Sequence, residues 1–246
     1  MQPPRLIVLD VAGTLVDDAG VVLAAFAIAL ERAGVEVSRD ELNAVRGANK
    51  LQVFRTFATR AYGPGPEAVR AAHEALATFN EELAVRFRDE PLDLFPGVAE
   101  ALEAMRGAGL KLATNSGFNR PVAELVLHRL RRELGLFDAH VCGDDVPAGR
   151  PAPFMIFLAM ERAEVADTRA VVVAGDTPLD LQAGTNAGAG AVVGVLTGTH
   201  DWQSLGAHRH THLIPSVADL PALLASEFGV EIAAPAAATV DEDRAR

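Results

Sequence analysis

Two patterns of apolar residues alternate along much of this chain. Short runs that are apolar throughout are separated by longer stretches in which apolar residues recur at helical spacing. The first run is 5–10, and beyond residue 90 the runs that predict strands are 110–116, 137–145, 170–177, 191–198 and 210–216. Wholly apolar short runs are typical of parallel strands buried on both faces. Strands alternating with helices therefore predict an α/β fold, with a Rossmann-like parallel sheet covered on both sides.

Residues 17–90 interrupt this alternation, because they predict helices with no strand between them. The segment 21–33 is apolar and rich in alanine at helical spacing, and Ser38 is a candidate N-cap for a second helix. A third helical pattern covers 49–61, and Pro66 opens a fourth, long helix that reaches about residue 88. This part of the chain is therefore expected to be almost entirely helical.

These patterns divide the 246-residue chain into two domains. Residues 1–16 and 91–228 predict the α/β core, and residues 17–90 predict a helical cap inserted after the first strand. Residues 229–246 show no periodicity and are expected to form a disordered tail. In open parallel sheets, ligands bind outside the carboxyl ends of the strands, where the strand order reverses. The strand ends are therefore the place to look for chemistry.

Net charge and cysteine content indicate which partners and which cellular compartment suit this chain. The net charge of −11 argues against nucleic acid or an anionic membrane as the partner, while a small anionic substrate remains open. The single cysteine, Cys142, excludes an internal disulfide framework and suits a reducing compartment. No apolar stretch reaches the roughly 20 residues of a membrane span, and the first apolar run is short for a signal peptide. These features predict a cytoplasmic location.

Polar residues follow the predicted strands. Asp10, Thr114 and Asp176 lie at strand ends, Asp180 follows Asp176 by one helical turn, and Arg150 precedes a proline-rich helix start. Carboxylates suit a hard cation such as Mg²⁺, which keeps some waters and meets phosphate oxygens. An arginine and a hydroxyl would hold the remaining phosphate oxygens, and a carboxylate beside phosphorus can act as a covalent nucleophile.

This constellation resembles the haloacid dehalogenase superfamily over nearly the whole chain. Four motifs carry the resemblance in order: Asp10-Val11-Ala12-Gly13-Thr14, Thr114 with Asn115, Arg150, and Gly175-Asp176-Thr177 with Asp180. The resemblance implies an Mg²⁺-dependent hydrolase with Asp10 as nucleophile. It implies that the metal ligands are Asp10, the Ala12 carbonyl, Asp176 and Asp180, although Asp180 could equally serve the structure. Thr114, Asn115 and Arg150 would bind the phosphoryl group.

Ala12 decides between branches of the superfamily. Phosphatases in it usually carry an aspartate at this place, which protonates the leaving oxygen, and alanine cannot do so. Cleavage of a C–P bond needs an electron sink instead, and a lysine imine supplies one. Lys50 in the cap, in the run Arg46-Gly47-Ala48-Asn49-Lys50, completes a resemblance to the phosphonoacetaldehyde hydrolase (phosphonatase) family or a phosphonatase-like branch.

That resemblance makes Lys50 the imine former. Its position in the first turn of the 49–61 helix is expected to lower its pKa. Val53 stands where the family has a histidine and Gly20 where it has a cysteine, which favours the phosphonatase-like branch and leaves the proton relay and the exact substrate open.

Three other functions stay open from the sequence. The first is a phosphomonoesterase that acts on a small phosphorylated metabolite. The second is dehalogenation of a 2-haloacid, which needs no Mg²⁺, and the third is a binding protein without turnover. The apolar run 21–30 also suggests a homodimer formed through the cap. The alternating His208, His210 and His212 invite a metal site, but they lie on an approach to an edge strand and are not expected to bind one.

Overall fold

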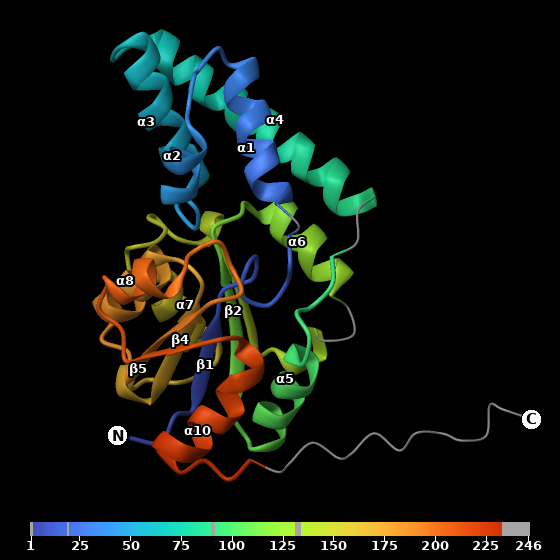
Figure 1. The fold of residues 1–246 in the computed structure, drawn as a ribbon, viewed down its shortest axis with the longest axis vertical. Helices are drawn as coiled ribbons and strands as arrows, with labels where there is room; N and C mark the ends of the chain where they lie inside the picture. Colours follow the sequence, from blue (N-terminus) through green and yellow to red (C-terminus); the bar gives the residue numbers. More distant parts are fainter. Residues whose placement is uncertain (1, 19, 90–91, 131–133, 233–246) are drawn as a thin grey trace, which may run out of the picture.

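The core of the molecule is a single parallel sheet, and the predicted α/β fold is confirmed. The structure is a computed structural model that describes residues 2–18, 20–89, 92–130 and 134–232. Six strands pair in the order β3-β2-β1-β4-β5-β6 (Figure 1). They are β1 Leu6–Leu9, β2 Lys111–Ser116, β3 Ala139–Cys142, β4 Val171–Gly175, β5 Ala191–Val195 and β6 His212–Ile214. Every pairing is parallel, which places all the strand carboxyl ends at one edge.

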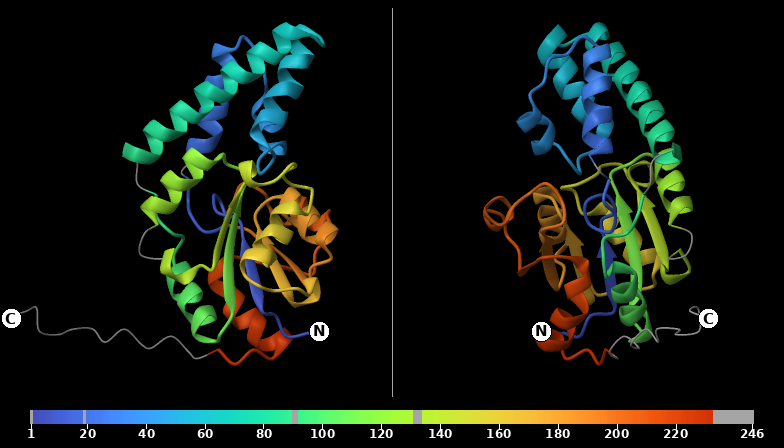
Figure 2. Two further views of the ribbon diagram at one scale, coloured as in Figure 1. Left: turned by 180° about the vertical axis from the view of Figure 1, so that it is seen from behind. Right: turned by 45° about the vertical axis from the view of Figure 1, so that its right-hand side comes forward.

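Helices cover both faces of the sheet (Figure 2). They are α5 Val98–Gly107, α6 Arg120–Arg129, α7 Phe154–Arg162, α8 Pro178–Ala187, α9 Trp202–Gly206 and α10 Leu220–Phe228. Alternate residues of β1 point to opposite faces, as the two-residue period of a strand requires. Ile7 and Leu9 join the apolar cluster that contains residues of α5, α6 and α10, whereas Leu6 and Val8 join the cluster of α7 and α8.

Four further helices lie beyond the carboxyl edge of the sheet and form what we call the cap segment (Figure 1). They are α1 Val21–Arg32, α2 Arg39–Ala44, α3 Lys50–Tyr62 and α4 Pro66–Asp89. The rings of Phe26, Phe54 and Phe79, one each from α1, α3 and α4, meet at centroid distances of 4.6 to 5.7 Å. Ser38 caps α2 as predicted.

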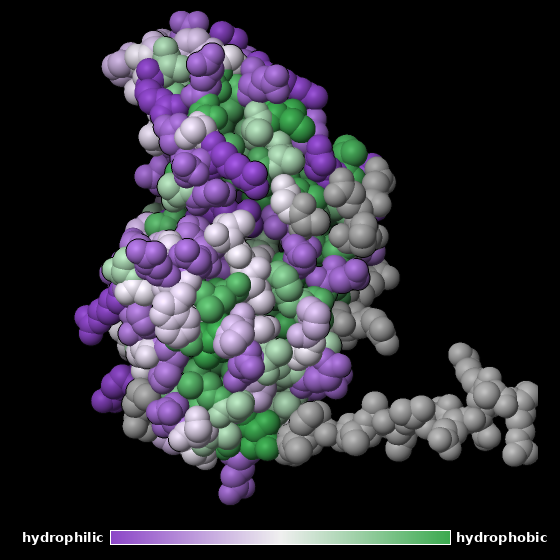
Figure 3. All heavy atoms as spheres, in the orientation of Figure 1, coloured by the Kyte–Doolittle hydropathy of each residue, from purple (hydrophilic) through white to green (hydrophobic). Residues whose placement is uncertain are grey.

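The apolar run of α1 packs mainly inside this segment. Its buried residues are Val21, Val22, Ala25, Phe26, Ala29 and Leu30. A homodimer through the cap stays a prediction, as does the division of the chain into two domains at residues 16 and 90. Figure 3 shows hydrophilic residues gathered around the level where the cap segment meets the sheet.

The observed elements differ from the predicted ones in three places. The short helix α9 was not predicted, because its five residues are too few for a periodic pattern. The helix expected at the proline-rich segment after Arg150 begins only at Phe154, with Pro153 as its N-cap. Val230 and Ile232, in the predicted tail, pack against the core, and residues 233–246 lie outside the described part of the chain. Among the described helices, none combines the length and the apolar character that crossing a membrane requires.

Candidate active site

The site lies where the strand order reverses, between β1 and β4. Asp10 directly follows β1 and Asp176 directly follows β4, and these two strands are paired neighbours. Both side chains are almost completely buried, with exposed fractions of 5% and 0%. The parallel sheet therefore brings two carboxylates that are far apart in the chain to one point at its carboxyl edge.

A tight turn after β1 fixes Asp176. Gly13 has a φ of +86°, a region that L side chains rarely adopt. A Cβ on Gly13 would lie 2.5 Å from Oδ2 of Asp176, so only glycine fits this approach. The next residue, Thr14, donates a hydrogen bond from Oγ1 to Oδ1 of Asp176 at 2.9 Å. The Gly13-Thr14 pair thus holds one oxygen of Asp176 and leaves the other without a protein donor.

Arg150 joins two of the carboxylates. Its Nη2 donates to Oδ1 of Asp10 at 2.6 Å, and its Nη1 donates to Oδ1 of Asp180. Asp180 is the third residue of α8 and forms a capping box with Thr177, whose N–H and hydroxyl both donate to Oδ2. Both oxygens of Asp180 are therefore engaged by the protein. In this arrangement Asp180 positions Arg150 and the start of α8.

The three carboxylates can hold a cation. Ligand oxygens of Asp10, Asp176 and Asp180 all lie within 4.8 Å of one another. Oδ2 of Asp176 is buried and has no hydrogen-bond partner, and burial, followed by the neighbouring Asp10, raises the pKa of Asp176 to about 7. A buried carboxylate oxygen without a donor is costly unless a cation or proton meets it. The donor set, all hard oxygens, fits Mg²⁺.

A small cavity of about 30 Å³ opens on Asp10 from the side of the cap segment. Its lining residues are Asp10, Ala12, Val22, Arg46, Gly47, Lys50, Ser116, Gly117, Phe118, Arg150 and Thr177. The segment between α2 and α3 sits directly on the core here. A Cβ added at Gly117 would lie 2.9 Å from the Gly47 carbonyl oxygen, and one added at Gly47 would lie 2.9 Å from Oγ1 of Thr177. The cap segment therefore covers one side of the cavity.

Lys50 is buried in this cavity, with an exposed fraction of 6%. It is the first residue of α3, and its Nζ donates to the Ala48 carbonyl at 3.0 Å. The ammonium lies between two rings, 5.5 Å from the Phe26 centroid and 5.7 Å from the Phe118 centroid. The structure therefore places this amine in the pocket of Asp10 and away from bulk solvent.

Burial lowers the pKa of Lys50 to about 7. The second cause is the positive charge of Arg150, while Asp10 opposes both. The sequence predicted the direction of this shift but attributed it to the helix N-terminus. Desolvation is the larger cause, because an ammonium loses its hydration in an apolar pocket.

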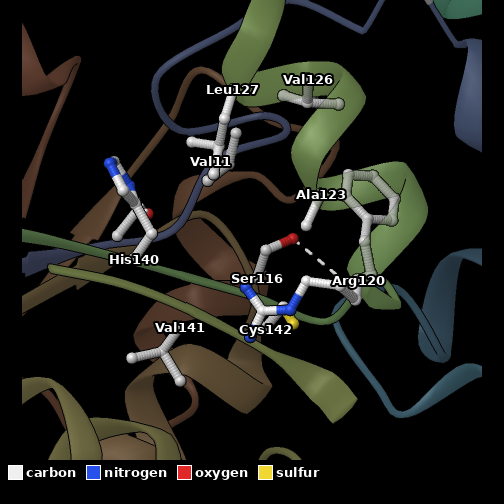
Figure 4. A pocket seen from close by; sticks show the side chains of 11 residues that line it. Val11, Ser116, Arg120, Ala123, Val126, Leu127, His140, Val141 and Cys142 are labelled. Atoms are coloured by element: carbon white, nitrogen blue, oxygen red, sulfur yellow. Dashed lines mark hydrogen bonds between the residues drawn. The ribbon is translucent and has the colours of Figure 1, made fainter. Parts of the chain in front are cut away.

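The structure places the hydroxyl of Ser116, and not the predicted hydroxyl of Thr114, in the lining of the cavity of Asp10. The Thr114 hydroxyl shares a hydrogen bond of 3.0 Å with Nδ1 of His140, and Thr114 does not line the cavity of Asp10 and Lys50. Ser116 points to the same face of β2 two residues further on, and it lines that cavity. Its hydroxyl also borders an apolar pocket beneath α6, where it accepts a hydrogen bond from the Phe118 N–H (Figure 4).

Asn115 is not brought into the cavity either. It is buried, with its Oδ1 unpartnered, and it alternates with Ser116 along β2. Of the other predicted residues, Asp10, Ala12, Lys50 and Arg150 line the cavity together, whereas Asp176 and Asp180 do not line it and cluster with Asp10. Val53, at the place of the family's histidine, is buried in the apolar cluster that spans the cap segment and one face of the sheet.

Sequence reasoning missed one cation of the site, Arg46. It lies four residues before Lys50, has an exposed fraction of 5% and lines the same cavity. Its Nη2 contacts both oxygens of the buried Asp18, each at 3.4 Å. The only signal in the sequence was Gly47, whose φ of +78° turns the chain so that residues on both sides of it face the cavity.

Comparisons with known proteins point to one family of hydrolases. A family model for haloacid dehalogenase-like hydrolases matches residues 4–188. A phosphonoacetaldehyde hydrolase from Syntrophobacter fumaroxidans is 33% identical over 198 residues, covering 76% of this chain and 70% of that protein. One from Bordetella pertussis is 31% identical over 259 aligned positions, covering 91% and 92%.

A solved structure is also similar. The crystal structure of a phosphonoacetaldehyde hydrolase-like protein from Oleispira antarctica matches with a TM-score of 0.77 and 21% identity, over 91% of this chain and 92% of that one. At that identity the likeness supports the fold. The similarity in sequence rests on the family model and on the relatives at 31% and 33% identity.

Proposed function

The chain belongs to the haloacid dehalogenase-like hydrolases, and we propose that it cleaves the C–P bond of phosphonoacetaldehyde or a similar 2-oxoalkylphosphonate through a Schiff base on Lys50. One observation carries the proposal above all. An amine with a pKa of about 7 is buried in the same cavity as Asp10, in a site whose position 12 has no acid. A phosphomonoesterase would need that acid and would have no use for a neutral amine.

Lys50 performs the first part of the reaction. Its neutral amine attacks the substrate carbonyl and, with loss of water, forms an iminium whose positive nitrogen can accept an electron pair. The rings of Phe26 and Phe118 lie at cation–π distance from the nitrogen, so they stabilise its positive charge in the absence of water. The closed cap segment excludes bulk water while the iminium forms.

Asp10 performs the second part. Its carboxylate attacks phosphorus, the C–P electron pair moves into an enamine, and water then hydrolyses the aspartyl phosphate and the imine. Arg150 holds Asp10 and is placed to meet a phosphonate oxygen, and the Ser116 hydroxyl is placed to donate to another. Mg²⁺ held by Asp10, Asp176 and the Ala12 carbonyl would supply positive charge against the phosphonate oxygens.

The pKa of Lys50 predicts a pH dependence of the reaction. Below about pH 7 the amine holds its proton and cannot attack, and above that pH it is neutral. We expect kcat/KM to rise about tenfold per pH unit up to pH 7 and then to level off. Arg150 and Arg46 favour the neutral amine, while Asp10 and Asp18 favour the charged one. A profile that rises steadily toward pH 10 would mean that Lys50 keeps an ordinary lysine pKa and would contradict this assignment.

The identity of residue 12 predicts the choice of substrate. We expect the protein with Mg²⁺ to release phosphate from phosphonoacetaldehyde at least about 100-fold faster than from phosphate monoesters, because Ala12 cannot protonate a leaving alkoxide. Phosphate release from phosphonoacetaldehyde and from phosphoglycolate, followed side by side, measures this ratio. Monoesters that are the better substrates would favour a phosphomonoesterase.

Dehalogenation and binding without turnover have less support. Dehalogenation of a 2-haloacid gives no role to the unpartnered oxygen of Asp176, and a binding protein without turnover gives no role to a neutral buried amine. We further propose that the partner is a small phosphonate, with no nucleic acid or membrane involved, in the cytoplasm. The net charge of −11 and the free, buried Cys142 support this proposal.

A further inference from the structure

Arg46 is a third buried cation in the cavity, and the reaction described above does not use it. Its side chain is 5% exposed, and its only hydrogen bonds run from Nη2 to Asp18, as far as the described residues show. Both contacts are 3.4 Å long, at the outer limit for a hydrogen bond. Arg150 differs, because two of its nitrogens donate hydrogen bonds to two carboxylates, those of Asp10 and Asp180. Nε and Nη1 of Arg46 therefore have no hydrogen-bond partner among the described residues, and Nε of Arg150 also lacks one.

The arrangement of the cavity decides which part of a substrate meets Arg46. Phosphorus must lie at Asp10, beside Arg150, and the carbonyl carbon must lie at Lys50. Val22, Arg46 and Gly47 are the lining residues of the cap segment that remain for the second substituent of that carbon, and Arg46 is the charged one among them. An aldehyde places only a hydrogen there. Asp18 offsets part of the desolvation cost of the buried guanidinium through two long contacts, and a substrate carboxylate would offset more of it, which a hydrogen cannot do.

We propose, building on the function proposed above, that Arg46 is a specificity-determining residue that binds a carboxylate on the carbonyl carbon of the substrate. The preferred substrate is then a 2-oxo acid whose third carbon carries the phosphonate. The planar fork of a guanidinium matches a carboxylate with two parallel hydrogen bonds, which an ammonium cannot do. The site would thus combine three cations with three parts of one substrate: Arg150 with phosphonate, Lys50 with carbonyl and Arg46 with carboxylate.

The chemistry of this substrate balances. Lys50 condenses with the 2-oxo group and releases water, Asp10 takes the phosphoryl group, and the C–P electron pair reduces the iminium to an enamine. Protonation at the third carbon and hydrolysis of the imine return the lysine and release a 2-oxo acid. A second water hydrolyses the aspartyl phosphate. The net reaction consumes one water and gives the dephosphonylated 2-oxo acid and inorganic phosphate, with no external oxidant or reductant.

A different role for Arg46 would be to fasten the cap segment. Asp18 lies just before α1, so its pair with Arg46 links two parts of the chain that flank that helix. The two roles differ in what they predict. A residue that only links parts of the cap segment changes the affinity for every ligand equally. A carboxylate-binding residue changes the affinity only for ligands that carry a carboxylate.

Two inert ligands separate these roles without any turnover. 3-Phosphonopropionate has the phosphonate and the carboxylate at the proposed spacing, and propylphosphonate lacks only the carboxylate. With Mg²⁺ present, titration calorimetry on the full chain is expected to show 3-phosphonopropionate binding about 10- to 100-fold more tightly, as hydrogen bonds between charged groups permit. A ratio near one in the unaltered protein would overturn the proposal.

Two variants complete the test. Arg46→Met is expected to bring the ratio of the two affinities to about one. Asp18→Asn is expected to keep the ratio, because the amide oxygen at position 18 can still accept a hydrogen bond from Arg46. An equal loss of affinity for both ligands in Arg46→Met would show that Arg46 only links parts of the cap segment, and it would overturn the proposal. Binding of propylphosphonate reports that each variant is folded. If the preference is present but no phosphonate is ever hydrolysed, the proposed function fails while the carboxylate site stands.

Discussion

Replacing Asp10 by asparagine is expected to lower kcat for phosphate release at least about 10⁴-fold, as loss of a nucleophile does in other hydrolases. The amide keeps the shape of the side chain but cannot accept the phosphoryl group. It also removes the negative charge that Arg150 contacts at 2.6 Å, and with it one ligand of the proposed metal site. Single-turnover phosphate release with excess enzyme measures the effect on the chemical step.

Asp180→Asn is the matched control for that loss. Asp180 also contacts Arg150, but both of its oxygens are engaged by the protein, so it acts through Arg150 and the start of α8. Its replacement is expected to raise KM and to lower kcat far less than Asp10→Asn does. Retention of more than about 1% of kcat in Asp10→Asn would mean that another group attacks phosphorus.

Replacing Lys50 by arginine is expected to lower kcat/KM for the phosphonate at least about 10³-fold. The guanidinium keeps the positive charge and most of the length, but it stays protonated and cannot form an imine. A loss of this size therefore reports on imine chemistry rather than on charge. The measurement is initial-rate phosphate release at pH 8, where the Lys50 amine is largely neutral in the unaltered protein.

The chain offers a matched control, because it has only one other lysine, Lys111. Lys111 opens β2 and donates to the Ala163 carbonyl at 2.6 Å, remote from the strand carboxyl ends. Lys111→Arg is expected to leave kcat/KM unchanged. Comparable activity of Lys50→Arg and Lys111→Arg would remove the Schiff base and favour an ordinary esterase.

The sequence predicted the sheet and the positions of Asp10, Asp176 and Arg150, because these depend on local patterns. An apolar run that ends in an aspartate places that residue at a strand end wherever the strand lies in the sheet. The same reasoning placed Lys50 at the start of a helix. It predicted a lowered pKa, but the larger cause, burial between Phe26 and Phe118, depends on how the cap segment packs.

Ser116 and Arg46 show which residues of the cavity local sequence patterns did not predict. Thr114 and Ser116 share one face of β2, and Ser116 is the one that reaches the carboxyl edge. The predicted strand, 110–116, ends where β2 ends, so Thr114 was favoured because it is the first polar residue in the second half of the run, not because the strand end was misjudged. Arg46 was missed because its burial depends on contacts of Gly47 with Thr177 and Gly117, residues of the core that are distant in sequence.

The central claim is that Lys50 forms a covalent imine with the substrate. Borohydride reduction in the presence of phosphonoacetaldehyde, with Mg²⁺, followed by peptide mass mapping, tests it most directly. We expect a stable adduct on the peptide that contains Lys50, none on the peptide that contains Lys111, and parallel loss of activity. Full phosphate release with no trapped adduct on Lys50 would contradict the account.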